Sequence, residues 1–309
     1  QLIMWSVFGL LVAIMLAIDL GLNRKSHEIS FREALTWTVI WISLALIFNA
    51  GIYLYLGPAK ALEFFTGYVI EKSLSVDNLF VFIMIFSYFH VPRLYQPKIL
   101  KWGIIGALVM RALFIWLGIE LLEAFHWMIY VFGAILIVTG IKMFFTNDQE
   151  PDLANNAAIR WISNRMRVTK ELHGDRFFVF RADERTGRMA LAATPLFLAL
   201  VVINLADLVF AVDSVPAIFA ITTDPFIVLT SNIFAILGLR AMYFLLAGVA
   251  DRFSLLKYGL AIVLMFIGVK MLLIDIYKIP VGFSLAVVAV IIGASVWASL
   301  RKDARAAKG

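Results

Sequence analysis

Cysteine is absent from the 309 residues, which excludes disulfide bonds, thiolate metal sites and cysteine nucleophiles within them. The four histidines lie at predicted loops or helix ends and do not have the spacing of a metal site. The sequence also lacks the Gly-x-x-x-x-Gly-Lys-Ser/Thr phosphate loop and any visible nucleophile–base pair. These absences argue against an enzyme, an ATP-driven pump and a zinc or copper site made of soft ligands.

Charged residues are also scarce. They make up 16% of the chain, whereas hydrophobic residues make up 62%. A soluble domain has about 25% charged and roughly 45–50% apolar residues. The composition therefore predicts an all-α polytopic membrane protein whose main partner is the lipid bilayer. We attribute the net charge of +6 to membrane topology rather than to nucleic-acid binding.

Runs of about 20 apolar residues, the length that crosses a bilayer, predict nine membrane spans within a single domain over residues 1–309. The predicted spans are 2–22, 34–56, 62–89, 99–120, 126–146, 193–221, 226–248, 255–277 and 280–300. The segment 147–192 is the long polar connection, and 157–169 within it is predicted to be an interfacial helix. The first run is too long for a cleaved signal peptide and has no basic residues before it.

Lysine and arginine set the predicted orientation. They are concentrated in alternate connections, among them 147–192, and in the C-terminal tail, whereas the intervening connections contain only Lys60 and Lys278. The positive-inside rule then places the N-terminus outside, with the 147–192 loop and the C-terminus in the cytoplasm. This separation of the two sides also supports an odd number of spans.

A short acidic pattern occurs twice in the chain. An acid, five further residues, an aspartate and then Asn or Ser run from Glu71 to Asn78 and again from Asp207 to Ser214. The matches continue downstream, where Arg111-Ala112 corresponds to Arg240-Ala241, and Gly140-Ile141-Lys142-Met143 corresponds to Gly268-Val269-Lys270-Met271. Residues 62–146 therefore form repeat one and 193–277 form repeat two, with 2–56 as peripheral helices and 280–300 as the final helix.

Each repeat contains three predicted spans. Because three is an odd number, the second repeat must cross the membrane in the opposite sense to the first. Inverted repeats of this kind are typical of secondary transporters, whose binding site lies near the middle of the membrane between the two halves. The predicted fold is thus an inverted 3+3 helix repeat with peripheral helices.

Four acids lie inside the predicted spans: Glu71, Asp77, Asp207 and Asp213. A charge at the bilayer centre costs about 2.5–3.5 kcal/mol on insertion scales, so these acids must face a cation or a basic side chain. One interpretation is that they pair with Arg111 and Arg240 and only hold the helices together. The acids outnumber those two arginines, which favours the second interpretation, a cation site.

Oxygen ligands of this kind suit Mg²⁺, Ca²⁺ and Mn²⁺. Asn78 and Ser214, at matching positions of the two copies, and Asn204, three residues before Asp207, add neutral oxygens to the candidate metal ligands. The same acids are candidates for a proton relay, and an exporter can use them for both purposes. Pro216 lacks an N–H and crowds the carbonyl of the residue four positions earlier, which predicts a helix break near it.

Five other polar residues within the spans are candidate charge partners or pathway residues. They are Lys72, Arg111, Arg240, Asn49 and Asn232. Lys72 follows Glu71 directly and therefore points about 100° away from it on a helix, which allows it to pair elsewhere. Asn49 has an alternative role as an interhelical hydrogen-bonding residue.

The stretches 67–78 (Gly-Tyr-Val-Ile-Glu-Lys-Ser-Leu-Ser-Val-Asp-Asn) and 210–219 (Phe-Ala-Val-Asp-Ser-Val-Pro-Ala-Ile-Phe) resemble the TerC family, as do 223–228, 231–246 and 253–260. The likeness covers nearly the whole chain. It implies an exporter of the bacterial inner membrane that acts in manganese homeostasis, with an association with tellurium resistance. It also implies that the acidic motif positions of the family are the four acids named above.

One position departs from the family pattern, which usually has Glu-x-x-Asp where this chain has Asn204-Leu205-Ala206-Asp207. Asn keeps an oxygen ligand but removes a charge. The leading hypothesis is a secondary transporter that exports Mn²⁺ as its substrate in exchange for H⁺. The alternatives are an exporter of another divalent cation or small solute, and a membrane stress or assembly factor that transports nothing. We expect no organic cofactor, no nucleic acid and no obligatory protein partner.

Overall fold

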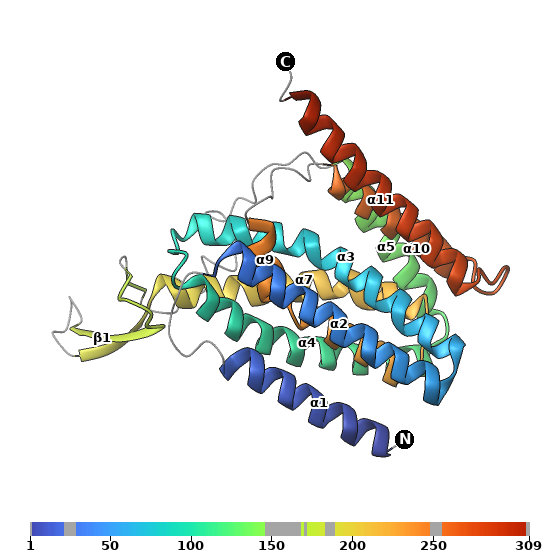
Figure 1. Ribbon diagram of the computed structural model, residues 1–309, viewed down its shortest axis with the longest axis horizontal. Helices are drawn as coiled ribbons and strands as arrows, with labels where there is room; N and C mark the ends of the chain where they lie inside the picture. The colour runs from blue at the N-terminus through green and yellow to red at the C-terminus, as the bar shows by residue number, and fades with distance from the viewer. Residues whose placement is uncertain are drawn as a thin grey trace.

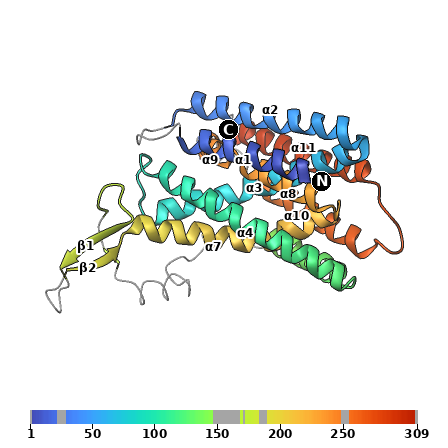
Figure 2. The same cartoon turned by 90° about the horizontal axis from the view of Figure 1, so that it is seen from below.

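The computed structural model describes residues 2–21, 29–145, 168–169, 172–182, 189–247 and 255–306. Helices account for most of them and lie side by side in a bundle, from one end of which a β-hairpin projects (Figures 1 and 2). The helices are α1 (Leu2–Gly21), α2 (Phe31–Leu56), α3 (Pro58–Tyr88), α4 (Gln96–Ala124), α5 (Met128–Phe145), α7 (Pro195–Phe219), α8 (Pro225–Ile236), α9 (Leu239–Ala247), α10 (Leu256–Leu272) and α11 (Val281–Ala306).

Each predicted span coincides with a helix, except that 226–248 is divided into α8 and α9. Within the described ranges, α2, α4, α5, α7 and α11 are long and apolar enough to cross a membrane, and the pair α8–α9 is a sixth if it counts as one bent span. Helix α3 does not meet this requirement because it carries the charged residues Glu71, Lys72 and Asp77, and α10 does not meet it because it has only 17 residues.

Proline and capping residues mark where the helices begin. Prolines occupy the first turns of α3, α4, α7 and α8, where a missing N–H removes no helical hydrogen bond. The Ser30 side chain accepts a hydrogen bond from the Glu33 amide at the start of α2. Between α2 and α3 stands the single residue Gly57, whose φ of 89° suits glycine and allows the sharp reversal.

The helices pack in pairs that cross between the two predicted repeats. Helix α3 packs against α8, α4 packs against α7, and α5 packs against α10. Backbone approach is closest between α5 and α10: a Cβ at Gly268 would lie 2.7 Å from the Gly133 carbonyl oxygen, and one at Gly140 would lie 2.7 Å from the Ala261 carbonyl oxygen. Only glycine permits this separation.

Helices α8 and α9 meet at an angle of 41°. The residue at the bend, Gly238, has a φ of +85°, and a Cβ there would lie 2.7 Å from Cγ of Trp41 on α2. Both the backbone conformation and the lack of space therefore require glycine. Near Pro216, by contrast, α7 continues for three more residues to Phe219. The described helix break therefore lies in the predicted span 226–248, at Gly238, rather than near Pro216 as predicted.

The hairpin consists of β1 (Phe178–Ala182) and β2 (Met189–Ala193), antiparallel with Phe178 opposite Ala193. The fold class is all-α as predicted, but the hairpin itself was not predicted. The apolar residues that alternate along it, such as Phe178 and Phe180, are typical of a strand. The predicted interfacial helix 157–169 lies outside the described residues apart from its end. There, Val168 forms a parallel bridge with Ala193 and is not helical.

Candidate functional site

Arg111 lies at the centre of the buried polar network. It projects from α4 with only 1% of its side chain exposed and forms ion pairs with Glu71 of α3 and Asp207 of α7. Its Nη2 lies 3.1 Å from Oδ1 of Asp207, and its Nε donates to Oδ2 of the same carboxylate at 3.4 Å. This two-point contact uses the planar geometry of the guanidinium. One acid from each copy of the motif therefore shares a single guanidinium.

Asn232 of α8 completes the network. Its Oδ1 accepts a hydrogen bond from Nη1 of Arg111 at 3.2 Å, and its Nδ2 donates to Oε2 of Glu71 at 3.4 Å. Both Asn232 and Glu71 are fully buried. Four helices, α3, α4, α7 and α8, are thus joined by one cluster in which two carboxylates share one positive charge. The prediction that Arg111 and Asn232 belong with the acids is consistent with this arrangement.

Asp213 lies apart from this cluster. It accepts a hydrogen bond from the Thr139 hydroxyl of α5 at 2.9 Å, and the charge of Lys142, one helical turn further along α5, also acts on it. The separation from Asp207 follows from helix geometry, because six residues rotate a side chain by about 600° and leave the two acids about 120° apart. Thr139 was not predicted as a partner of the acids. The sequence indication is its position one helical turn before Lys142, which places both side chains on the same face of α5.

Asp77 is part of helix α3, but its side chain lies outside the described part of the structure. Among the side chains that are described, no group of three His, Asp or Glu residues is arranged to hold a metal ion. Glu71 and Asp207 are held by Arg111 instead, and Asp213 by Thr139. Among the predicted ligands whose side chains are described, no metal centre is assembled.

Several buried oxygens along α3 and α7 have no hydrogen-bond partner among the described residues. They are Oγ of Ser75, Oδ1 of Asn204 and Oγ of Ser214. Ser75 is one turn beyond Glu71, and Asn204 is one turn before Asp207. The Asn204 amide donates to the Leu200 carbonyl at 2.9 Å, while its Oδ1 lies against Gly106 of α4. Buried oxygens without partners are rare in folded proteins and call for an explanation such as a bound ion or water.

The remaining predicted residues have varied surroundings. Lys72 donates to the carbonyl oxygens of Ala235 at 3.1 Å and Leu237 at 3.4 Å, at the bend between α8 and α9, and forms no ion pair with a described carboxylate. Asn78 is buried on α3, and Arg240 is buried in the first turn of α9. Asn49 lies on α2, and its Oδ1 is buried without a hydrogen-bond partner among the described residues.

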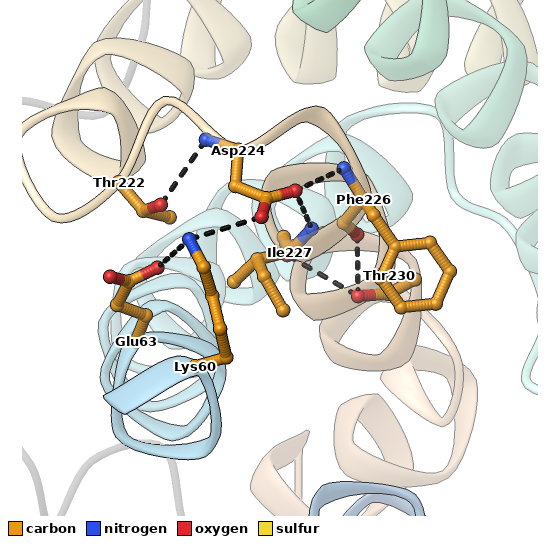
Figure 3. A network of polar contacts seen from close by, with 7 residues as sticks. All are labelled: Lys60, Glu63, Thr222, Asp224, Phe226, Ile227 and Thr230. Atoms are coloured by element: carbon orange, nitrogen blue, oxygen red, sulfur yellow. Dashed lines mark hydrogen bonds and ion pairs between the residues drawn. The ribbon is translucent and has the colours of Figure 1, made fainter. Parts of the chain in front are cut away.

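A second polar cluster, which the sequence did not predict, lies where α3 begins (Figure 3). Nζ of Lys60 is 2.9 Å from Oε2 of Glu63 and 3.0 Å from Oδ2 of Asp224. Asp224 also caps α8 by accepting from the amides of Phe226 at 3.0 Å and Ile227 at 3.5 Å. These residues border an open hollow beside the α7–α8 connection. The cluster ties the start of α3 to the connection that follows the second acidic motif.

Comparison with known proteins gives a consistent set of relatives. The model of the integral membrane protein TerC family matches residues 56–307. A protein of Escherichia coli K12 named as a membrane-bound redox modulator, Alx, is 50% identical over 93% of this chain and 90% of its own. An uncharacterized membrane protein of Myxococcus xanthus is 50% identical over 98% of this chain and 93% of its own, and one of Rickettsia bellii is 41% identical over 97% and 98%. No solved structure matches.

Proposed function

We propose a function for the chain on one premise: the chain belongs to the TerC family of integral membrane proteins. It is a multi-pass membrane protein in which the polar network around Arg111 is buried among apolar helices. The function that fits these features best is the export of Mn²⁺ from the cytoplasm across the bacterial inner membrane in exchange for protons. In this proposal the N-terminus is outside, and the C-terminus and the 147–192 loop are cytoplasmic.

The proposal includes nine spans built around an inverted repeat, and the helix packing supports the repeat. In this repeat α3 corresponds to α7, α4 to α8–α9, and α5 to α10. A two-fold rotation that exchanges the repeats would therefore convert the contact between α3 and α8 into a contact between α7 and α4. Both contacts are observed. The same exchange relates the contact of Gly133 with Gly268 to that of Ala261 with Gly140. A two-fold relation of this kind would place the acidic motifs at equivalent depths from opposite sides.

The observation that carries the proposal is the set of buried oxygens without partners, from Ser75, Asn204 and Ser214, on the two helices that hold the acids. Leaving a buried polar group unsatisfied costs about 1–3 kcal/mol. Carboxylate, amide and hydroxyl oxygens are also the ligands that a hard divalent cation prefers. We therefore propose that the oxygens of Ser75, Asn204 and Ser214 bind the transported cation. The other proposed ligands are Glu71, Asp77, Asp207, Asp213 and Asn78.

In the proposed mechanism, Arg111 supplies the positive charge that Mn²⁺ supplies when it is bound. The guanidinium forms ion pairs with both Glu71 and Asp207, so neither carboxylate is buried without a partner. When Mn²⁺ enters, it takes the place of Arg111 and of any protons on the acids. Protons that return from outside compete with Mn²⁺ for the same oxygens and favour its release.

Flux in proteoliposomes that contain a metal-sensitive dye tests the proposal. We expect the parent protein to carry Mn²⁺, a proton gradient to accelerate the flux, and Asp213→Ala and Asp77→Ala to abolish it. Lys270→Gln is a matched control, because it removes a buried charge that lies outside the acidic network. Equal flux in the parent and in Asp213→Ala would contradict the site. Equal flux of Ca²⁺ and Mn²⁺ would support the broader alternative, an exporter of divalent cations.

A second candidate is a membrane stress or assembly factor that transports nothing, and two observations favour it. The relatives named Alx carry a name that assigns a redox role provisionally, although this chain has no thiol within its 309 residues. The hairpin also exposes Phe180, Met189 and Leu191 on one face, as a docking surface would. Under this candidate, Phe180→Ser would abolish stress tolerance in cells, while Asp213→Ala would leave it intact. The transporter proposal predicts the opposite order.

A further inference from the structure

The network at the centre of the bundle contains one arginine, although the two repeats supply two. The repeat makes Glu71 the counterpart of Asp207, and Arg111 the counterpart of Arg240. Among the described residues, Glu71 and Asp207 form ion pairs with Arg111 and with no other basic side chain. Both acids of the equivalent pair are thus held by one of the two equivalent arginines.

The two-fold relation between the repeats connects both arginines to the same pair of acids. A rotation that exchanges α3 with α7, and α4 with α8–α9, is the one that the helix packing supports. It places Glu71 where Asp207 lies and Asp207 where Glu71 lies. The pair of acids is therefore unchanged, whereas Arg111 and Arg240 exchange positions. A network with the repeats exchanged would contain the same two carboxylates with Arg240 between them.

The described network has room for one guanidinium. Nε and Nη2 of Arg111 meet the two oxygens of Asp207. Nη1 of Arg111 meets Oε1 of Glu71, and Nδ2 of Asn232 donates to Oε2 of the same carboxylate. All four carboxylate oxygens are therefore engaged, in a cluster where Arg111 is 1% exposed and Glu71 is fully buried. Because protein interiors are close-packed, a second guanidinium can approach both acids only if Arg111 withdraws.

The helices that carry the two arginines differ in shape. Helix α4 is continuous from Gln96 to Ala124 and passes through Arg111. The second pair of helices bends by 41° at Gly238, two residues before Arg240. Arg240 is itself buried, with 6% of its surface exposed, so it lies inside the bundle. The equivalent arginines thus follow different helix paths, and in the described conformation only the path of α4 brings its arginine to Glu71 and Asp207.

We propose that Arg240 is the partner of Glu71 and Asp207 in a second conformation of the protein, in which it occupies the position that Arg111 has in the described one. In transporters with inverted repeats, one repeat moves against the other around a fixed site. Each conformation without substrate then keeps one guanidinium between the two carboxylates. The transported cation replaces Arg111 from one side of the membrane and Arg240 from the other. This inference rests on the proposed export function, which it deepens by assigning Arg240 as a positioning residue of the same site.

Removal of Arg111 should favour the second conformation. Without Arg111, Glu71 and Asp207 lack a cation in the described conformation, whereas the second conformation still has Arg240. A change that raises the free energy of only one of two states moves the equilibrium toward the other. Neutral substitutions of the acids, Glu71→Gln and Asp207→Asn, should cancel this shift, because neither conformation then needs a guanidinium at the site.

The distance between two spin labels in the full chain, measured in lipid nanodiscs without added metal, tests the inference. Because these 309 residues include no cysteine, cysteines introduced at Ala247 and Val138 are the only labelling sites. Ala247 is the exposed last residue of α9. Val138 is exposed on α5, which serves as a fixed reference because of its close backbone contact with α10. A movement of α9 that brings Arg240 to the acids therefore changes the measured distance.

The parent should show one main distance, with a second one at no more than ~10% of the molecules. In Arg111→Gln the second distance should become the main one. It should disappear again when Arg240→Gln is added, and it should not arise when Arg111→Gln is combined with Glu71→Gln and Asp207→Asn. Lys270→Gln is the matched control, because it removes another buried cation, and it should keep the parent distance.

Thermal unfolding shows whether each variant is folded. If Arg111→Gln does not fold, Arg111→Gln/Asp207→Asn gives the same comparison, because it leaves Glu71 as an acid for Arg240 to meet. If a folded variant without Arg111 keeps the parent distance, or if the second distance persists after Arg240→Gln is added, the inference is wrong. Because no metal is present, a parent protein that carries no Mn²⁺ although its variants show the expected distances would overturn the export function alone. A parent that carries Mn²⁺ while Arg111→Gln keeps the parent distance would overturn the role of Arg240 alone.

Discussion

Replacement of Arg111 by methionine is the sharpest test of the network at the centre of the bundle. The change removes the cation and keeps a side chain that can fill much of the space. It leaves Glu71 and Asp207, each at most 3% exposed, without their shared partner, and Asn232 without one of its hydrogen bonds. Removing one partner from a buried ion pair typically costs about 3–5 kcal/mol. We expect a loss of this size in the free energy of unfolding at neutral pH.

The assay is reversible unfolding in mixed micelles, with Lys98→Met as the matched control. Lys98 also forms an ion pair, with Asp175 at 2.9 Å, but the two side chains are 31% and 50% exposed. An exposed pair contributes about 0–1 kcal/mol. The loss in free energy of unfolding when the cationic side chain is replaced by methionine should therefore be several kcal/mol larger at Arg111 than at Lys98. A cost for Arg111→Met no larger than that for Lys98→Met would refute the electrostatic reasoning.

A double-mutant cycle isolates the charge interaction. In a background with Glu71→Gln and Asp207→Asn, Arg111→Met no longer strands two carboxylates, so its cost should shrink markedly. The cycle also connects to the proposed function, because a divalent cation can replace the missing guanidinium. Free Mn²⁺ at about 100 times the parent's Kd stabilises the folded parent by about 2.7 kcal/mol. At that same Mn²⁺ concentration we expect a larger gain in Arg111→Met, because its Kd should be lower. An unchanged cost in the neutral background would show that the ion pairs contribute nothing.

Three further predictions follow from individual contacts. A non-glycine residue at positive φ costs ~1–2 kcal/mol. Gly238→Ala should destabilise the protein by more than this, because its Cβ would also lie 2.7 Å from Trp41. Thermal unfolding measures the loss, and an unchanged melting temperature would contradict the described bend. Gly268→Ala should lower the melting temperature by several degrees through the 2.7 Å approach to the Gly133 carbonyl, whereas Gly293→Ala on α11, with nothing within 4 Å, should not. Hydrogen bonds from Tyr130 and His126 lower the pKa of the Asp275 carboxyl. The stability they contribute should be complete above the ordinary aspartate pKa and should be lost as the pH falls through the lowered pKa. An NMR titration that gave Asp275 its usual pKa of 3.8 would contradict this.

Much of the helical framework could be predicted, because the length and hydrophobicity of a run are properties of the local sequence. The nine predicted ranges coincide with described helices, and proline and glycine mark several of their ends. The hairpin was missed because its short alternating strands lie in a polar connection where a surface helix had been expected. The bend at Gly238 was not predicted, because a lone glycine in an apolar run gives a weaker signal of a break than Pro216 does, yet α7 continues through Pro216.

The candidate site could be predicted only as a set of residues. The cost of placing a charge in a membrane singles out the four acids together with Arg111 and Arg240. Of these, Glu71, Asp207 and Arg111 meet in the structure, where Asn232 joins them. Their pairing could not be predicted, because spacing along one helix does not tell which neighbouring helix each side chain faces. Asp213 was grouped with Asp207, yet it accepts its hydrogen bond from Thr139 on a different helix.

The sequence by itself determined that the chain lies in a membrane, that it carries a duplicated acidic motif, and that few residues can hold its intramembrane charges. These conclusions rest on composition and on the free energy of transferring each side chain, which do not depend on the fold. Only the tertiary structure decided that Arg111 is shared by two acids and that Lys72 binds backbone carbonyls rather than a carboxylate. Those choices depend on how each helix is rotated against its neighbours, and close packing, such as that of Gly133 against Gly268, fixes this rotation.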